Sequence, residues 1–571
     1  MDNQNNKVEL MWAVKIPMRD GINLNATVYK PQEMPEPLPV IFTMSPYIAD
    51  TYHEWAMYYA RNGYVYAAVD LRGRGNSEGE FAVLENDAHD GYDVVEWFAA
   101  QPWCNGKVGM WGGSYGGYNQ WTIAKEFPPH LVTILPYAAA YPAVDMPFYK
   151  NIYYSYETQW LTLVSGRTPN ANLFGDSSFW TEKFTRLYKE HLPFKELDRL
   201  VGNPSPLFQK YLDHPCDDAY WQSLAPSPDD YQKLDIPILS VTGHYDGDQP
   251  GALAYYRRHM QYGSEKAKAN HYLVIGPWDH GGTRKPKKEV GGLSFADAAL
   301  VDMKVLNKEW YDWVMKGGEK PAFLKQRVAY YLVGPEEWKY ADNLEEIATE
   351  TRRYYLDSHD GQPNDVFHAG MLAVEPHVHA PADRFTYDPL DTRPGDLEQV
   401  EVEKYLLDQT YALNLFGNGL VYHSEPFEED TEVTGTLKLG AWISMDVPDT
   451  DFVATLYEIR LDGTSVMLTR DMLRARYRES REHEKLVTPG EVNVYVFDWF
   501  TFFSHSIAKG SRLRLVFGCP NSIQTQKNYN SGGDVNSETA VDARVAHITL
   551  HHDTQHASYL EVPVVRQAKK E

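Results

Sequence analysis

A short glycine-rich motif between two segments of different hydrophobic pattern constrains the fold of this chain most. Gly112-Gly113-Ser114-Tyr115-Gly116 follows an apolar run over 107–111 that predicts a strand, and it precedes a helical pattern over 115–127. The motif G-x-S-x-G alone is weak, but a strand directly before it and a helix directly after it are typical of a nucleophile elbow. We therefore predict that Ser114 is a nucleophile in an α/β-hydrolase fold.

Strand-like and helical segments alternate along the first 140 residues and again from about residue 236. The strands are expected over 39–44, 64–70, 107–111, 131–135, 236–241 and 271–275, and the helices over 52–61, 87–100, 115–127, 252–261 and 296–315. Alternation of this kind implies a mostly parallel sheet with helices on both faces.

The residue composition and the hydrophobic pattern of the sequence change at two places. Residues 145–230 are rich in aromatic and charged side chains with helical spacing and no clear strands, which predicts an inserted helical cap. After about residue 345, short alternating segments separated by turn residues indicate a jelly-roll-like β-sandwich. We therefore predict an α/β protein with a discontinuous core over 1–144 and 231–345, a cap over 145–230 and a sandwich over 346–571.

A serine hydroxyl is a weak nucleophile at neutral pH and needs an adjacent base. In the α/β-hydrolase fold its partners follow in the order Ser, Asp or Glu, then His. Asp246 and Asp248 both follow the strand expected over 236–241, so either is well placed as the acid. His280 lies in a glycine-rich loop after the strand over 271–275 and is the expected base.

Other residues compete for these roles. His244 is a rival base, but it precedes the acid, and Asp279 is a rival acid, but it stands beside His280, where facing the ring is awkward. Histidines also gather near the C-terminus, and we interpret them as strand and tail residues, because no metal-ligand spacing is present. They are His547, His551, His552 and His556. We expect no metal and no cofactor.

Charge and cysteine content limit the partners and the location. The formal net charge of −25 would repel phosphate backbones, so we expect no nucleic-acid partner. The three cysteines lie far apart and give no disulfide framework, which fits a reducing compartment. No signal peptide and no apolar run of about 20 residues is visible, so we expect a cytoplasmic protein without a membrane partner. A homo-oligomer is left open.

Several stretches besides the elbow resemble one family of serine hydrolases. They are Ser45-Pro46-Tyr47, Asp70 to Gly79, Gly112 to Gly117, Tyr245-Asp246-Gly247, Gly276 to His280, Tyr422 to Pro426, Pro448 to Phe452 and Leu473 to Arg478. Together they resemble the family that contains X-Pro dipeptidyl-peptidases, cocaine esterases, α-amino acid ester hydrolases and glutaryl acylases. The resemblance covers almost the whole chain.

The resemblance implies a catalytic triad of Ser114, Asp246 and His280. It also implies an oxyanion hole made from the backbone N–H of Tyr115 and the hydroxyl of Tyr47. Such a site hydrolyses a small-molecule ester or amide through an acyl-enzyme and needs no metal or cofactor.

The acyl group is harder to predict. In α-amino acid ester hydrolases, acidic residues near the triad hold the substrate ammonium, and Asp248 and Asp145 have suitable positions. Gln249, however, stands where those enzymes carry a second acid. We therefore favour a neutral carboxylic ester, with cap aromatics such as Trp160 and Tyr153 in the pocket.

Three alternatives stay open. The first two, an α-amino acid ester hydrolase and an X-Pro dipeptidyl-peptidase-like aminopeptidase, would act on substrates with a free amine. Those peptidases are usually longer, with an extra N-terminal helical domain, for which residues 1–30 leave no space. The third is a non-catalytic carbohydrate-binding or scaffold protein on a degenerate hydrolase fold, against which the Ser–Asp–His order argues.

Overall fold

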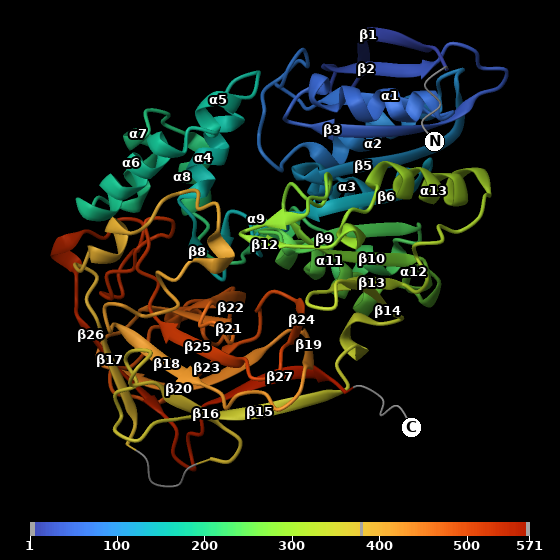
Figure 1. Cartoon of the computed structure of the whole chain (residues 1–571). Helices are drawn as coiled ribbons and strands as arrows, with labels where there is room; N and C mark the ends of the chain where they lie inside the picture. Colours follow the sequence, from blue (N-terminus) through green and yellow to red (C-terminus); the bar gives the residue numbers. More distant parts are fainter. Residues whose placement is uncertain (1–5, 377–380, 567–571) are drawn as a thin grey trace, which may run out of the picture.

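The computed structural model describes residues 6–376 and 381–566. The chain folds into an α/β-hydrolase core, a helical cap and a C-terminal jelly-roll-like β-sandwich, which lies below the other two parts in Figure 1. The domain limits expected from the sequence stay a proposal. The core strands nearest to them are β6 (Leu131–Ala139), before the cap, and β9 (Ile238–Tyr245), after it.

Within the described residues, the core sheet has ten strands in the order β1-β2-β4-β3-β5-β6-β9-β10-β13-β14. Besides β6 and β9, its strands are β1 (Val8–Pro17), β2 (Asn23–Pro31), β3 (Leu38–Ser45), β4 (Val65–Asp70), β5 (Cys104–Ser114), β10 (His271–Asp279), β13 (Val328–Leu332) and β14 (Glu337–Ala341). From β4 to β13 neighbouring strands pair in parallel, which confirms the expected mostly parallel sheet. The loops that follow β3, β5, β9 and β10 therefore meet along one edge.

Helices cover both faces of this sheet, as expected. α1 (His53–Arg61) and α13 (Met303–Lys316) pack with Ile41 on one face, whereas Val40 and Phe42 of the same strand face α2 (Asp87–Ala99) and α3 (Tyr115–Ala124). α11 (Gln249–Tyr262) packs on β6 and β9, and α12 (Glu265–Ala269) follows it. Among the residues described, no helix combines the length and the apolar character that crossing a membrane would need.

Two features at the edges of the core differ from the sequence prediction. The helix expected over 296–315 begins only at Met303, because Asp302 caps it by accepting the backbone N–H groups of Lys304 and Val305 at 3.1 and 3.2 Å. The hairpin of β1 and β2 was not expected and adds an antiparallel edge to the sheet. Most of β1 is exposed, and a bulge between Met11 and Val14 breaks the alternation of apolar residues that identifies a strand in a sequence.

The cap is helical, but it also contains a short hairpin that was not expected. Its helices are α4 (Tyr156–Leu163), α5 (Ala171–Phe174), α6 (Ser177–Lys189), α7 (Leu197–Leu200), α8 (Pro206–Leu212), α9 (Ala219–Ser223) and α10 (Pro228–Lys233). The hairpin joins β7 (Phe148–Tyr149) to β8 (Ile152–Tyr153) through Lys150 and Asn151, whose φ angles of 45° and 67° suit a tight two-residue turn. Strands of two residues are too short to show a period of two.

The sandwich is built from short strands with a shared apolar core. They are β15 (Glu350–Asp357), β16 (Gly370–Ala373), β17 (Asp383–Tyr387), β18 (Gly419–His423), β19 (Thr431–Gly435), β20 (Lys438–Met445), β21 (Asp451–Ile459), β22 (Ser465–Arg474), β23 (Asn493–Phe497), β24 (Phe503–Ile507), β25 (Arg512–Gly518), β26 (Ala546–His551) and β27 (Tyr559–Val565). Alternate residues such as Phe452, Ala454 and Leu456 of β21 point into this core.

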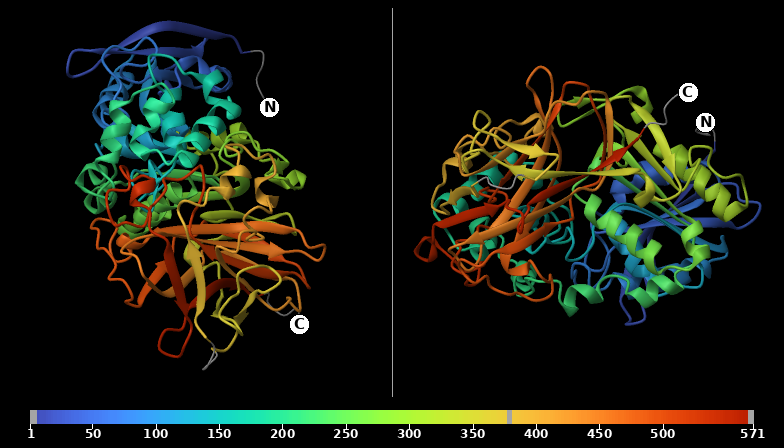
Figure 2. Two further views of the ribbon diagram at one scale, coloured as in Figure 1. Left: turned by 90° about the vertical axis from the view of Figure 1, so that its left-hand side faces the viewer. Right: turned by 90° about the horizontal axis from the view of Figure 1, so that it is seen from below.

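Buried polar contacts join the sandwich to the other two parts, which Figure 2 shows packed against it. Gln249, at the start of α11, donates to the carbonyl oxygen of Phe502 at 2.8 Å and accepts its backbone N–H at 2.7 Å. Arg474, at the end of β22, donates to the carbonyl oxygen of Asn151 in the cap hairpin at 2.9 Å. The three parts therefore form one continuous body.

Candidate active site

Ser114 lies at the turn between β5 and α3. Its φ of 62° and ψ of −123° put a residue with a side chain in a strained backbone conformation. The turn is tight, because a Cβ atom on Gly112 would lie 2.8 Å from the carbonyl oxygen of Gly116. A Cβ atom on Gly117 would lie 2.6 Å from the carbonyl oxygen of Tyr137. The chain thus has the strand, serine and helix arrangement of a nucleophile elbow.

Asp246 and His280 meet at the same edge of the sheet, because Asp246 directly follows β9 and His280 directly follows β10. Nδ1 of His280 lies 2.8 Å from Oδ1 of Asp246 and 3.8 Å from Oδ2 of Asp248. The Asp246 side chain is fully buried and accepts the backbone N–H of Asp248 at 3.1 Å and the hydroxyl of Thr242 at 2.9 Å. Of the two candidate acids, Asp246 is the one hydrogen-bonded to the imidazole.

The rival residues have other partners. Oδ1 of Asp279 accepts the backbone N–H of Gly282 at 2.6 Å, which shapes the loop that carries His280. Nε2 of His244 lies 2.7 Å from the carbonyl oxygen of Tyr331, and burial lowers the pKa of His244 to about 4. Asp279 therefore supports the loop, and His244 is a buried neutral side chain.

The C-terminal histidines have separate partners. His547 lies 2.7 Å from a carboxylate oxygen of Asp446, and His551 lies 2.9 Å from the hydroxyl of Ser444. His552 is buried in the sandwich, 3.4 Å from a carboxylate oxygen of Asp383. Over 6–376 and 381–566, no group of three or more His, Cys, Asp or Glu side chains is arranged to hold a metal ion.

Burial and charge together set the protonation of the His280–Asp246 pair. Burial alone would lower the pKa of His280, but the carboxylates of Asp248 and Asp246 outweigh burial and raise it. Burial alone would raise the pKa of Asp246, but its interaction with His280 outweighs burial and lowers it. Asp246 is therefore an anion at neutral pH, and it stabilises the imidazolium form of His280.

Tyr47 lies in the loop after β3, next to Ser114. The indole N–H of Trp160 donates to the Tyr47 hydroxyl oxygen, with 3.0 Å between Nε1 and Oη. Burial raises the pKa of Tyr47, and hydrogen bonds with Trp160 and Ser114 offset this only in part. The phenol therefore stays protonated at neutral pH and can donate a hydrogen bond.

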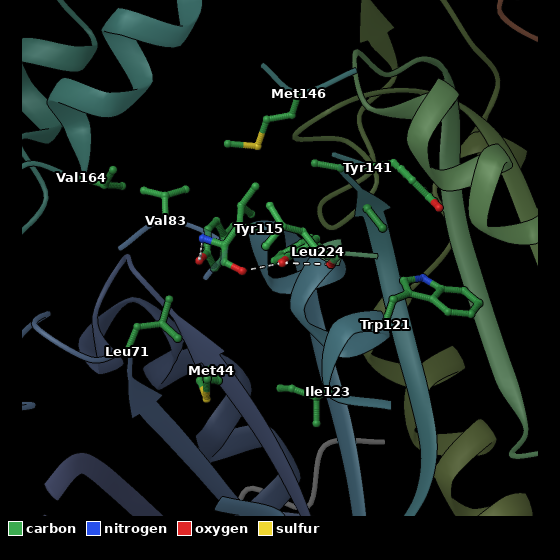
Figure 3. Close-up of a cluster of buried hydrophobic side chains, with 14 of the residues drawn as sticks. Met44, Leu71, Val83, Tyr115, Trp121, Ile123, Tyr141, Met146, Val164 and Leu224 are labelled. Atoms are coloured by element: carbon green, nitrogen blue, oxygen red, sulfur yellow. Dashed lines mark hydrogen bonds between the residues drawn. The ribbon is translucent and has the colours of Figure 1, made fainter. Parts of the chain in front are cut away.

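Tyr115 is the first residue of α3, so its backbone N–H is one of those that a helix leaves without an internal partner. Its side chain is 2% exposed, and its hydroxyl donates to Asp87 at 2.7 Å. Figure 3 shows its ring in the hydrophobic cluster that also contains Val83 and Leu224. The ring of Trp160 stacks on it, with centroids 6.0 Å apart and planes 16° from parallel. Tyr115 is therefore held rigidly beside the elbow.

Trp160 and Asp248 both lie at this site, whereas Tyr153 does not. Tyr153 is 1% exposed, and its hydroxyl donates to the carbonyl oxygen of His214 at 3.1 Å. Its ring packs against Phe148 inside the cap. The carbonyl oxygens of Tyr211 and His214 hold the Tyr153 hydroxyl inside the cap, so the prediction that Tyr153 lines the pocket was wrong.

The residues considered for ammonium recognition have unequal environments. The two carboxylate oxygens of Asp145 accept the backbone N–H groups of Tyr141 at 2.8 Å and Gly251 at 2.5 Å. Gln249 is occupied by the sandwich, as described above. Asp248 has a carboxylate oxygen 3.8 Å from Nδ1 of His280, and burial raises the pKa of Asp248 to about 6.

Two residues that the sequence did not point to lie near this group. Glu157 of α4 is 4% exposed, and its Oε2 has no hydrogen-bond partner. Burial, and then repulsion by Asp248, raises the pKa of Glu157 to about 8. The guanidinium of Arg284 packs on Gly113, and its buried Nη1 has no hydrogen-bond partner. Its positive charge offsets a small part of the rise in the pKa of Asp248. No motif marks either residue, because both come close only when the chain folds.

Fold and site together define an α/β-hydrolase with a serine at the nucleophile elbow. A model of the X-Pro dipeptidyl-peptidase (S15) family matches residues 20–282, and a model of the X-Pro dipeptidyl-peptidase C-terminal non-catalytic domain matches residues 308–561. The chain belongs to the X-Pro dipeptidyl-peptidase (S15) family of serine hydrolases.

Relatives span nearly the whole chain. A cocaine esterase from Rhodococcus sp. (strain MB1 Bresler) is 26% identical over 97% of this chain and 98% of its own length. An aminopeptidase from a marine sediment Thaumarchaeota archaeon superimposes with a TM-score of 0.83 at 21% identity, over 98% of this chain and 97% of its own. An α-amino acid ester hydrolase does so with a TM-score of 0.83 at 20% identity, over 99% and 98%. The two structures establish likeness of fold.

Proposed function

We propose that this protein cleaves carboxylic esters through an acyl-enzyme on Ser114, with Asp246 and His280 completing the triad. The observation that carries the proposal is the hydrogen bond of 2.8 Å between His280 Nδ1 and Asp246 Oδ1, at the same edge of the sheet as a serine in a strained turn. The cocaine esterase named above, which matches over nearly its whole length, supports ester substrates in particular.

The proposed reaction has two halves. His280 accepts the hydroxyl proton of Ser114 at Nε2 while the serine oxygen attacks the carbonyl carbon, and Asp246 stabilises the imidazolium from the other side of the ring. The tetrahedral intermediate collapses as His280 gives the proton to the leaving alcohol. Water then attacks the acyl-enzyme by the same steps and releases the acid.

Two donors would stabilise the oxyanion of each tetrahedral intermediate. They are the hydroxyl of Tyr47 and the backbone N–H of Tyr115. Both are fixed before substrate arrives, since Tyr47 is held by Trp160 and Tyr115 begins a helix. Removing one such donor typically lowers kcat by about 10²- to 10³-fold.

Hydrolysis of p-nitrophenyl butyrate by the wild type and by Ser114→Ala tests the proposal. We expect the wild type to turn over and Ser114→Ala to lose at least about 10⁴-fold in kcat, because the nucleophile is gone. An unchanged far-UV spectrum of the variant serves as the folding control. A wild type that hydrolyses no ester would instead favour the non-catalytic alternative.

An α-amino acid ester or an N-terminal aminoacyl group is the second candidate for the substrate. The partnerless Oε2 of buried Glu157, together with Asp248, favours it, because a bound ammonium group would lower the raised pKa of Glu157 and pair with both carboxylates. The aminopeptidase and the α-amino acid ester hydrolase that share the fold act, by their names, on such substrates.

Comparing kcat/KM for phenylglycine methyl ester and phenylacetic acid methyl ester separates the two candidates. A preference of more than about tenfold for the amino ester, lost in Glu157→Gln and Asp248→Asn, would establish the ammonium site. Equal rates, or a preference for the neutral ester, would leave the neutral carboxylesterase.

A further inference from the structure

Trp160, on the cap helix α4, contacts both residues proposed for the oxyanion hole. Its indole N–H donates to the hydroxyl oxygen of Tyr47, with 3.0 Å between Nε1 and Oη. Its ring stacks on the ring of Tyr115. The Trp160 side chain is 6% exposed, so little water competes for the indole N–H. One cap residue thus lies against both halves of the hole.

The direction of the hydrogen bond between Trp160 and Tyr47 follows from the chemistry of the two groups. An indole nitrogen can only donate, whereas a phenol both donates and accepts. The Tyr47 oxygen therefore accepts from Trp160, and this bond does not use the hydroxyl hydrogen of Tyr47, which can be donated to a different acceptor. A phenol that already accepts one hydrogen bond is also a stronger donor.

A buried arginine fixes the distance between the segments that carry these two side chains. Arg74 is 0% exposed and donates from Nε to the carbonyl oxygen of Pro46 at 2.8 Å and from Nη1 to that of Val164 at 2.6 Å. Pro46 directly precedes Tyr47, and Val164 directly follows α4. The loop of the core and the helix of the cap are therefore tied together within a few residues of the Trp160–Tyr47 bond.

We infer that Trp160 is a positioning residue that aligns the hydroxyl of Tyr47 toward the oxyanion, which makes the cap part of the transition-state machinery as well as a cover for the substrate. The inference rests on the proposed acyl-enzyme mechanism and adds a residue to it. An interaction that matters only when the oxyanion forms changes kcat and leaves KM unaffected.

Trp160→Phe removes the indole N–H and keeps an aromatic ring against Tyr115. We expect kcat for p-nitrophenyl butyrate to fall by about 5- to 30-fold with KM within about twofold of the wild type. Trp180→Phe is the matched control, because Trp180 is a buried cap tryptophan whose N–H donates to the carbonyl oxygen of Leu173 at 2.8 Å, away from the site. It should keep wild-type kcat.

A double-mutant cycle with Tyr47→Phe separates positioning from general packing. If Trp160 acts through the Tyr47 hydroxyl, then Trp160→Phe has less than about a twofold effect on kcat in the Tyr47→Phe background. An equal loss in both backgrounds, a loss confined to KM, or wild-type kcat in Trp160→Phe overturns the inference. If Trp160→Phe does not fold, β-(3-benzothienyl)alanine at position 160 retains the bicyclic shape without the N–H, and the same outcomes apply.

The cycle also distinguishes failure of this inference from failure of the proposed function. Wild-type kcat in Tyr47→Phe would remove Tyr47 from the oxyanion hole and the role of Trp160 with it, while leaving Ser114 as the nucleophile. Wild-type kcat in Ser114→Ala would remove the acyl-enzyme mechanism itself.

Discussion

At the residue scale, two carboxylates act on one imidazole. Asp246 is hydrogen-bonded to His280, whereas Asp248 lies 3.8 Å away and acts through its charge. Both raise the pKa of His280 against the opposite effect of burial. Since the base must be neutral to accept a proton, activity falls as the pH drops through this raised pKa.

Asp248→Asn should therefore move the acid limb of the kcat/KM profile to lower pH. The variant removes one of the negative charges that raise the pKa of His280, so the imidazole stays neutral in more acidic solution. Steady-state kinetics between pH 5 and 8 measure the shift. Asp462→Asn, in an exposed turn of the sandwich, makes the same change in charge and should leave the limb in place. A limb that is unmoved, or moved to higher pH, in Asp248→Asn would contradict this account of the site.

The sequence could predict that Ser114, Asp246 and His280 lie at one edge of a parallel sheet, because Ser114 ends a strand and the other two each directly follow one. The strand pattern alone left Asp246 and Asp248 as equal candidates, since both follow the same strand, and the family resemblance favoured Asp246. Trp160 was expected to line the pocket, but its bond with Tyr47 depends on how the cap packs on the core. No local pattern encodes that packing.

At the element scale, the end of β22 carries a buried ion pair that orders the contact between sandwich and cap. Arg474 makes two hydrogen bonds with Asp451, at 2.8 and 2.9 Å, and both side chains are 3% exposed. The same guanidinium donates to the carbonyl oxygen of Asn151 in the cap hairpin. This hairpin lies in the segment that leads into α4.

Arg474→Met should destabilise the protein by about 3–5 kcal/mol, because it leaves the Asp451 carboxylate buried without its partner. Urea unfolding followed by fluorescence measures the change. Arg393→Met is the control: Arg393 pairs with Asp391 at the surface, with 63% of its side chain exposed, and should cost no more than about 1 kcal/mol. Equal stability of the two variants would show that the buried pair does not hold this contact.

Most core elements were predictable from hydrophobic pattern, and the failures have local causes. The helix predicted over 296–315 was too long at its N-terminus. The apolar spacing already begins before Asp302, the residue that caps the helix. The hairpin β7–β8 was missed because its strands have two residues each. The edge strand β1 was missed because a bulge between Met11 and Val14 interrupts the alternation of its inward residues.

At the scale of the whole molecule, the sandwich supports the core and the cap. Its contacts with Gln249 and with the cap hairpin are buried, so removing it would take away the protein donors of Gln249 Oε1 and of the carbonyl oxygen of Asn151. The sequence indicated a sandwich but gave no information on where it packs, because contacts between distant segments leave no periodic signal. The cytoplasmic location stays a prediction, and the oligomeric state stays open.

Deletion of residues 350–571 should yield insoluble or inactive protein. The truncation leaves the apolar and polar surface that the sandwich covers exposed to water. Soluble yield and p-nitrophenyl butyrate hydrolysis are the measurements. A soluble truncated chain with full activity would show that the sandwich is dispensable for the site.

The central claim is that Ser114 is the nucleophile, and covalent labelling with a fluorophosphonate tests it most directly. We expect one probe per chain, mapped by mass spectrometry to the peptide that contains Ser114, with esterase activity lost in proportion to labelling and no labelling of Ser114→Ala. A folded wild-type protein that hydrolyses esters while Ser114 stays unlabelled, or that carries the probe on another residue, would contradict the account.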